Sequence, residues 1–317
     1  MLWTYFPPEI ILLPKNITVK LKQKGIRKMH SLIFLIIATL SSASMAVVLK
    51  IFRKQEGNRY GIILGNYLTC TVLAFILMPK DSGIIPDNGI TWLCGVIAGA
   101  LFVLGLLGMQ SSVQKNGAIL TSAFSKLGLI IPLVISVMFF GESIHLIQIV
   151  GILMVFAAII LISFDKNGTF TDRKGKIYPL LLIALLLFCG GGDAMAKIFE
   201  QVGRRDQDGE YFLILFVTAT ILTIGLLLHE RLKKGRKVIW KEFAAGILVG
   251  IPNYFSSFLL LKSLTGLPAF VVYPSFSAGT LLIVTLIAAI IFKERPGLKA
   301  WIGLALIVVS LVLLNIK

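Results

Sequence analysis

Apolar residues in this chain gather in runs of about 20, the length that an α-helix needs to cross the hydrocarbon core of a bilayer. The runs do not alternate as half-buried strands do, and they are too long for buried strands. A backbone inside lipid must satisfy its own hydrogen bonds, which helices do. We therefore predict an all-α integral membrane protein. Ten transmembrane helices are expected, at residues 31–49, 60–78, 90–110, 117–140, 145–164, 177–199, 211–229, 243–262, 268–292 and 297–316.

The second half of the chain repeats the first. A glycine pair at residues 95 and 99 recurs at residues 246 and 250. Each half would hold five spans, and because five is odd, the second copy must enter the membrane from the opposite side. The predicted fold is therefore two inverted five-helix repeats. A longer pattern recurs without a gap 152 residues later: Phe140, Glu142, Gly151 and Leu161 return as Phe292, Glu294, Gly303 and Leu313.

The predicted domain organisation follows from this duplication. A basic N-terminal tail covers residues 1–30, and a start codon assigned too early would also explain it. The first repeat is expected at residues 31–164 and the second at residues 177–317. The segment 165–176 between them is short and polar, so we interpret it as a linker and not as a domain.

Composition and charge exclude several classes of function. Hydrophobic residues make up 57% of the chain and charged residues 15%, which leaves little surface for water. The formal net charge is +16. In a soluble protein such an excess would suggest nucleic acid, but here it fits basic loops beside a membrane. The expected partners are the lipid bilayer and a small-molecule solute, with no nucleic acid.

The basic loop residues are distributed unevenly between the two sides of the membrane. Sorted by the predicted spans, 18 Lys and Arg residues fall on one side and 5 on the other, with 6 more in the tail on the poorer side. The positive-inside rule then places the richer side in the cytoplasm and both termini outside. A translated basic tail would weaken this assignment.

No motif for catalysis or cofactor binding stands out. The sequence has no phosphate-cradling loop, and its three histidines are scattered. Cys70, Cys94 and Cys189 have no metal-ligand or redox spacing, and we interpret them as small packing residues. We therefore expect a protein that is not an enzyme and that has no cofactor and no metal site.

Charged residues inside the spans are informative, because a charge at the bilayer centre is costly. Lys126 lies near the middle of the fourth predicted span. One interpretation is a binding group for an anionic or hydroxylated substrate. The other is structural, with the ammonium pairing with backbone carbonyls or reaching toward the headgroups.

Asp193 and Lys197 lie four residues apart in the sixth predicted span, with the acid first. This order favours a helical ion pair, which would neutralise both charges and let the helix insert. The alternative is a role in coupling, with Asp193 as a proton-linked or substrate-linked carboxylate. Lys197 could also lie at the level of the headgroups.

Polar residues and prolines gather in the third, fourth, eighth and ninth predicted spans. Prolines lie at residues 132, 252 and 274, and each removes a backbone donor, which suits a kinked cavity wall. For any single serine or asparagine, hydrogen bonding between helices is the simpler interpretation. With Lys126, the candidate substrate-binding residues are Gln110, Asn253, Tyr254, Tyr273 and Ser275.

A short motif precedes the last span of each repeat: Phe140-Gly-Glu142 and Phe292-Lys-Glu294. With its ten spans in two repeats, the chain resembles the EamA-type permeases of the drug/metabolite transporter (DMT) superfamily over residues 31–316. The resemblance implies a central cavity lined by the third, fourth, eighth and ninth spans and operated by alternating access. It implies no particular substrate. We interpret both glutamates as structural, because a carboxylate suits the N-terminus of the helix that follows it.

The expected function is secondary transport of a small polar or amphipathic solute, a metabolite or drug, across the plasma membrane. The alternative is a membrane scaffold without transport, or a membrane enzyme that modifies lipid carriers. Such an enzyme would normally need acids, histidines or a catalytic loop near the surface, and the short loops here lack them. A monomer or weak homo-oligomer is expected, since internal duplication removes the need for a dimer.

Overall fold

Regular structure in this protein is helical throughout the part that can be described. The computed structural model describes residues 15–51, 59–79, 86–116, 118–163, 178–234, 240–293 and 296–316. Within these ranges nine helices are long and apolar enough to span a membrane, and a shorter apolar helix at Leu146–Ile162 supplies a tenth. The predicted all-α membrane fold is confirmed.

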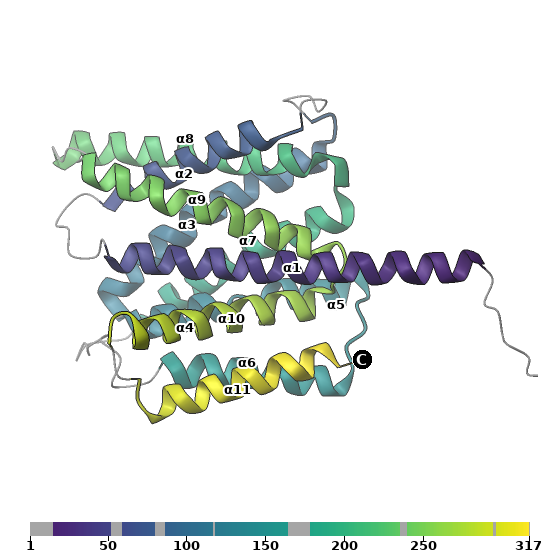
Figure 1. Cartoon of the computed structure of the whole chain (residues 1–317). Helices are drawn as coiled ribbons and strands as arrows, with labels where there is room; N and C mark the ends of the chain where they lie inside the picture. Colours follow the sequence, from purple (N-terminus) through teal and green to yellow (C-terminus); the bar gives the residue numbers. More distant parts are fainter. Residues whose placement is uncertain are drawn as a thin grey trace, which may run out of the picture.

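The helices follow one another as two sets of five spans (Figure 1). The start of α1 and the end of α11 lie at the same end of the bundle, as an even number of spans requires. The first set contains α1 (Lys15–Ile51), α2 (Arg59–Leu77), α3 (Gly89–Asn116), α4 (Ala118–Leu127), α5 (Ile130–Phe140) and α6 (Leu146–Ser163). The second contains α7 (Pro179–Val202), α8 (Asp208–Lys234), α9 (Trp240–Leu264), α10 (Ala269–Ile290) and α11 (Leu298–Asn315), with a short 3-10 turn, η2 (Arg205–Gln207), before α8.

The first helix begins earlier than the sequence indicated. α1 already starts at Lys15, whereas residues before 31 were expected to form a tail. Its apolar stretch covers Gly25–Met45, so its first turns extend beyond the ends of the neighbouring helices (Figure 1). Residues 1–14 of the expected tail lie outside the described part of the chain.

The two repeats pack against each other through equivalent helices. α1 packs on α9 and α10, and its counterpart α7 packs on α3, α4 and α5. In the same way α2 packs on α9, while α8 packs on α3. The remaining principal contacts join like with like, α2 to α8 and α6 to α11. Each of these contacts therefore has a counterpart with the repeats exchanged, which is the pattern expected of two inverted copies.

Glycine pairs allow these helices to approach closely. A Cβ atom on Gly99 of α3 would overlap the carbonyl oxygen of Leu215 in α8. A Cβ atom on Gly246 of α9 would likewise overlap the carbonyl oxygen of Ile62 in α2. The repeated glycines thus serve the same purpose in both halves, because only a residue without a side chain leaves room for the facing backbone.

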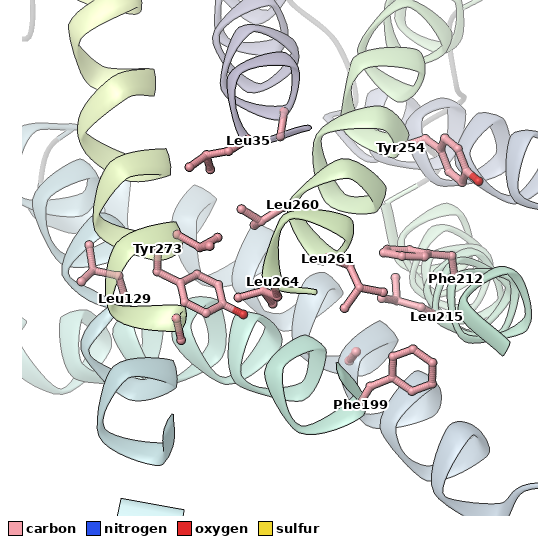
Figure 2. Packing of buried hydrophobic residues seen from close by; sticks show 14 of the residues in the cluster. Leu35, Leu129, Phe199, Phe212, Leu215, Tyr254, Leu260, Leu261, Leu264 and Tyr273 are labelled. Atoms are coloured by element: carbon pink, nitrogen blue, oxygen red, sulfur yellow. The ribbon is translucent and has the colours of Figure 1, made fainter. Parts of the chain in front are cut away.

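Leucine side chains and aromatic rings pack together inside the bundle (Figure 2). Phe199 of α7 stacks on Tyr211 of α8 with ring centroids 4.3 Å apart. Phe212 of α8 meets Tyr254 of α9 edge to face at 6.3 Å. Offset and edge-to-face rings are favourable pairs because of their quadrupoles, so these contacts fix α7, α8 and α9 relative to one another.

Candidate functional site

The fourth span is divided into two helices, α4 and α5, where one helix was expected at residues 117–140. The break lies one turn before Pro132, whose nitrogen carries no hydrogen to donate. The amide of Ile131 instead donates to the carbonyl of Gly128, three residues back, at 3.0 Å. Lys126 therefore lies in the last turn of α4, next to interrupted backbone. Irregular backbone at membrane depth is tolerated where protein buries it or where it lines a cavity.

The break in the fourth span rests against the glycine triplet of α7. A Cβ atom on Gly128 would lie 2.9 Å from the backbone nitrogen of Gly190, and one on Gly190 would overlap the carbonyl oxygen of Gly128. α7 continues as a helix through this triplet. The triplet therefore provides close packing between the repeats and brings residue 126 and the following turn of α7 into the same region.

Lys126 and Asp193 interact electrostatically across this contact. Both lie deep in the protein, and each is among the charges that act on the other. Their side chains are nevertheless partly accessible. Neither makes a direct ion pair with another of the residues that the structure describes. The two opposite charges, one from each repeat, thus influence each other without forming a direct ion pair.

Three further polar side chains complete this arrangement. Tyr273 of α10 donates its hydroxyl hydrogen to the backbone carbonyl of Asp193 at 2.7 Å and is 1% exposed. Figure 2 shows its ring projecting from α10 into the buried region. Ser125 Oγ donates to Cys189 Sγ at 3.5 Å. We refer to Ser125, Lys126, Cys189, Asp193 and Tyr273 as the central polar cluster, which α4, α7 and α10 supply together.

Asn253 and Tyr254 lie in a different place, where α9 packs on α2. Asn253 Nδ2 donates to Asn66 Oδ1 at 3.1 Å, and the thiol of Cys70 donates to the carbonyl of Gly250 at 3.2 Å. Tyr254 is 1% exposed and packs among aromatic rings. For Asn253 the structure therefore shows the simpler of the two expected roles, a hydrogen bond between helices.

The two remaining candidates make no side-chain hydrogen bond within the described residues. Gln110 is a partly exposed residue of α3. Ser275 is a buried residue of α10 whose hydroxyl has no partner there. The structure thus brings Lys126, Asp193 and Tyr273 together and leaves the other four predicted binding residues outside their direct contacts.

Lys197 pairs with two glutamates and not with Asp193. Its ammonium lies 2.9 Å from Glu142 Oε1 and 2.9 Å from Glu200 Oε2, and its side chain is 1% exposed. Glu200 follows on the same helix, whereas Glu142 belongs to the α5–α6 connection of the other repeat. The spacing of residues in α7 could indicate only neighbours within that helix. It could not indicate Glu142, because this partner belongs to the first repeat.

Glu142 also binds the first turn of α10. Its carboxylate oxygens accept from the backbone amide of Ala269 at 2.9 and 3.3 Å. A carboxylate at a helix N-terminus is favourable, as the sequence interpretation supposed. The helix concerned is α10 of the second repeat, however, and not the helix that follows Glu142 in the chain. The counterpart Glu294 lies outside the described residues.

We refer to Glu142, Lys197, Glu200 and the amide of Ala269 as the Lys197 cluster. The sequence alone indicated neither a role for Glu200 nor a contact between Glu142 and Lys197. One signal was available, because both members recur: Lys50-Ile-Phe52 matches Lys197-Ile-Phe199, and Glu294 matches Glu142. Residues that are duplicated together are candidates for a shared contact.

A surface hollow lies apart from both clusters, between the start of α1 and the α9–α10 connection. Its volume is about 430 Å³. The residues that line the hollow are Ile26, Arg27, His30, Ser31, Phe34 and Thr265.

The resemblance implied a cavity among the third, fourth, eighth and ninth spans. The central polar cluster instead takes its side chains from the fourth, sixth and ninth spans.

Two inverted helical repeats with opposite charges deep at their boundary define a membrane protein of the transporter class. The chain matches the model of the EamA-like transporter family at residues 29–164 and 176–316. It therefore belongs to that family. Its helices and its family make it a multi-pass protein of the plasma membrane.

Three relatives and one solved structure illustrate the range of similarity. An uncharacterised protein of Haemophilus influenzae is 24% identical over 292 residues, 87% of this chain and 94% of that protein. QacG of a Staphylococcus species, a quaternary ammonium compound-resistance protein, is 31% identical over 106 residues, 33% of this chain and 94% of its own. ArnE of Proteus mirabilis, a probable 4-amino-4-deoxy-L-arabinose-phosphoundecaprenol flippase subunit, is 28% identical over 115 residues, 33% of this chain and 97% of its own.

The similarity in structure extends over nearly the whole chain. A crystal structure with 13% sequence identity superposes with a TM-score of 0.70 and covers 90% of this chain and 96% of the other. At this sequence identity the similarity shows a shared fold and nothing about function. QacG and ArnE, in contrast, each match a third of the chain, which is less than one repeat.

Proposed function

We propose that this protein is a secondary transporter that moves a small polar or amphipathic solute across the plasma membrane by alternating access. One observation carries the proposal. Lys126 from the first repeat and Asp193 from the second are deep, partly accessible and electrostatically linked, yet neither closes a direct ion pair within the described residues.

The membrane surroundings of Lys126 and Asp193 support a functional role for their charges. A charge inside a membrane protein normally pairs, faces water or serves function, because leaving it in hydrocarbon is costly. Placing the charges at the boundary between two inverted repeats has a further consequence. Each repeat can adopt the conformation of the other, which turns the site from one side of the membrane to the other.

The chemistry of the cluster favours a charged solute. The ammonium of Lys126 would bind an anionic or hydroxylated group, and the carboxylate of Asp193 would bind a cationic or donor group. Tyr273 would hold this turn of α7 in place through the carbonyl of Asp193. If transport is coupled to protons, Asp193 is the acid that would carry them. QacG is named for resistance to quaternary ammonium compounds, and ArnE for a lipid-linked amino sugar. Both compounds contain a nitrogen that can carry positive charge, which agrees with a carboxylate at the site.

The test compares matched solutes. Thermal shifts of the purified protein would be measured with sets of three molecules that differ only in charge: an amino acid, the amine without its carboxylate, and the acid without its amine. Flux of those that stabilise the protein would then be measured in proteoliposomes. We expect Lys126→Ala to abolish flux while the protein remains inserted.

The control is Lys241→Ala, because Lys241 is exposed at the start of α9. It should transport as the wild type does. Wild-type flux in Lys126→Ala would remove Lys126 from the site. No flux of any tested solute by the wild type, combined with a stable protein partner, would favour the scaffold alternative.

A further inference from the structure

We propose that the Lys197 cluster is a latch that closes one face of the protein and positions the Asp193–Tyr273 part of the central polar cluster. This inference rests on the proposed alternating access. The latch would join the two repeats in the conformation described above and would have to open before the site could face that side.

The position of the cluster supports this role. Glu142 lies in the connection between α5 and α6, Ala269 is the first residue of α10, and Lys197 lies near the end of α7. These three places are at the same end of the bundle, which also holds the start of α1 and the end of α11 (Figure 1). The distribution of basic loop residues predicts that this is the outer face.

The contacts of the cluster cross between the repeats. Glu142 belongs to the first repeat and binds two elements of the second, Lys197 in α7 and the amide of Ala269 in α10. The carboxylates are largely buried, with Glu142 at 15% and Glu200 at 4% exposed. A buried ion pair adds little net stability, but losing one partner is costly. Such a contact therefore favours the conformation that makes it over one in which its charged groups are apart but still buried.

The latch and the central polar cluster are linked through two helices. Lys197 lies one turn beyond Asp193 on α7, and Ala269 lies one turn before Tyr273 on α10. The hydroxyl of Tyr273 bonds the carbonyl of Asp193, and Glu142 joins the adjacent turns of the same two helices. Separating α7 from α10 at this face would therefore break the Glu142 contacts and release Asp193 from Tyr273.

The chain offers a matched pair of variants. Glu142→Gln and Glu200→Gln each remove one negative charge from the same lysine and leave it one carboxylate. The Glu142–Lys197 pair joins the two repeats, whereas Glu200 and Lys197 lie three residues apart on one helix. The side-chain amide that Glu142→Gln introduces keeps an oxygen that can accept from the backbone amide of Ala269, so this variant mainly removes the ionic link.

The natural Cys189 can report on access to the site. It is partly exposed and belongs to the central polar cluster, whereas Cys70 and Cys94 are buried. In a Cys70→Ala, Cys94→Ala background, Cys189 would be the single thiol. Its reaction with a membrane-impermeant maleimide would be measured separately from each face of sealed vesicles that contain oriented protein.

We expect Glu142→Gln to raise labelling of Cys189 from the latch face about tenfold, which corresponds to a shift of about 1.4 kcal/mol between conformations. Labelling from the opposite face should fall, because molecules that adopt one conformation are lost from the other. Glu200→Gln should stay within about twofold of the wild type at both faces, as its change leaves the inter-repeat link in place. A mere loosening of the fold would instead raise labelling from both faces.

Unchanged labelling in Glu142→Gln, or equal effects of Glu142→Gln and Glu200→Gln, would overturn the latch. If Glu142→Gln does not fold, the same labelling experiment with Ala269→Pro tests the latch. Proline is well accepted at the first position of a helix and removes the amide that Glu142 binds, so it too should raise labelling from the latch face. Flux measured in parallel separates the two proposals: flux without the labelling response disproves the latch, and the labelling response without flux disproves the transport function.

Discussion

Single charged residues in the interior of this protein have different surroundings. Lys126 and Asp193 are placed where lipid and packed helices leave them few other partners, and each reduces the cost of the other. Lys197, in contrast, is fully engaged by Glu142 and Glu200. The residues that sequence spacing paired are thus assigned to different tasks, Asp193 to the central polar cluster and Lys197 to a contact between repeats.

We predict that Lys126 and Asp193 are energetically coupled. Asp193→Asn and Lys126→Met should each lower the thermal unfolding midpoint, because each leaves the other charge uncompensated in a low-dielectric interior. The double variant should lose less than the sum of the two, with a coupling energy of about 0.5–3 kcal/mol. Unfolding of the four proteins in detergent provides the measurement. Additive losses would mean that the two charges act independently.

Helices of this fold are held together by backbone contacts that only glycine permits. The break between α4 and α5 lies against Gly190, and that contact fixes the distance between the fourth span and α7. Pro132 explains why the break occurs near this point, since it cannot donate the hydrogen bond that would continue the helix. Together these two features place the last turn of α4, with Lys126, beside α7.

We predict that Gly190→Ala destabilises the protein by about 1–3 kcal/mol, because its Cβ atom would overlap the carbonyl oxygen of Gly128. Gly225→Ala is the matched control. It is also a helical glycine, but a Cβ atom there would meet nothing within 4 Å. Its effect should stay within about 1 kcal/mol. Equal unfolding midpoints for the two variants would show that the contact at Gly190 is not tight in the membrane.

The whole molecule is organised by the inversion of its repeats. Equivalent contacts exchange the two copies, so α1 with α9 corresponds to α7 with α3. Inversion also means that equivalent connections lie on opposite faces. The α5–α6 connection carries Glu142 of the Lys197 cluster, and α11 begins at the other end of the bundle (Figure 1).

We predict that single cysteines at Ser143 and Lys299 react with impermeant reagents from opposite sides of the membrane. Both positions are exposed, one in the α5–α6 connection and the other in the first turn of α11. A background without the three natural cysteines makes the labelling specific. Labelling of both positions from the same side would contradict the odd number of spans in each repeat, and with it the inverted fold.

The sequence by itself determined the number of spans, their grouping into two repeats and the charged residues that lie inside the spans. Each of these is a local property, because hydrocarbon thickness sets the length of an apolar run and a charge within such a run is evident without a structure. Parity of the spans then gave the inversion. Lys126 and Asp193 could be identified in this way.

Only the tertiary structure decided which residues meet. The spacing of Asp193 and Lys197 describes neighbours on one helix, whereas one of the two glutamates that pair with Lys197, Glu142, comes from the other repeat. The same holds for the cap on α10, for the bond of Asn253 to Asn66 and for the contact of Gly128 with Gly190. Such contacts depend on how two separate bundles face each other across an axis, and no periodicity within a single helix contains that geometry.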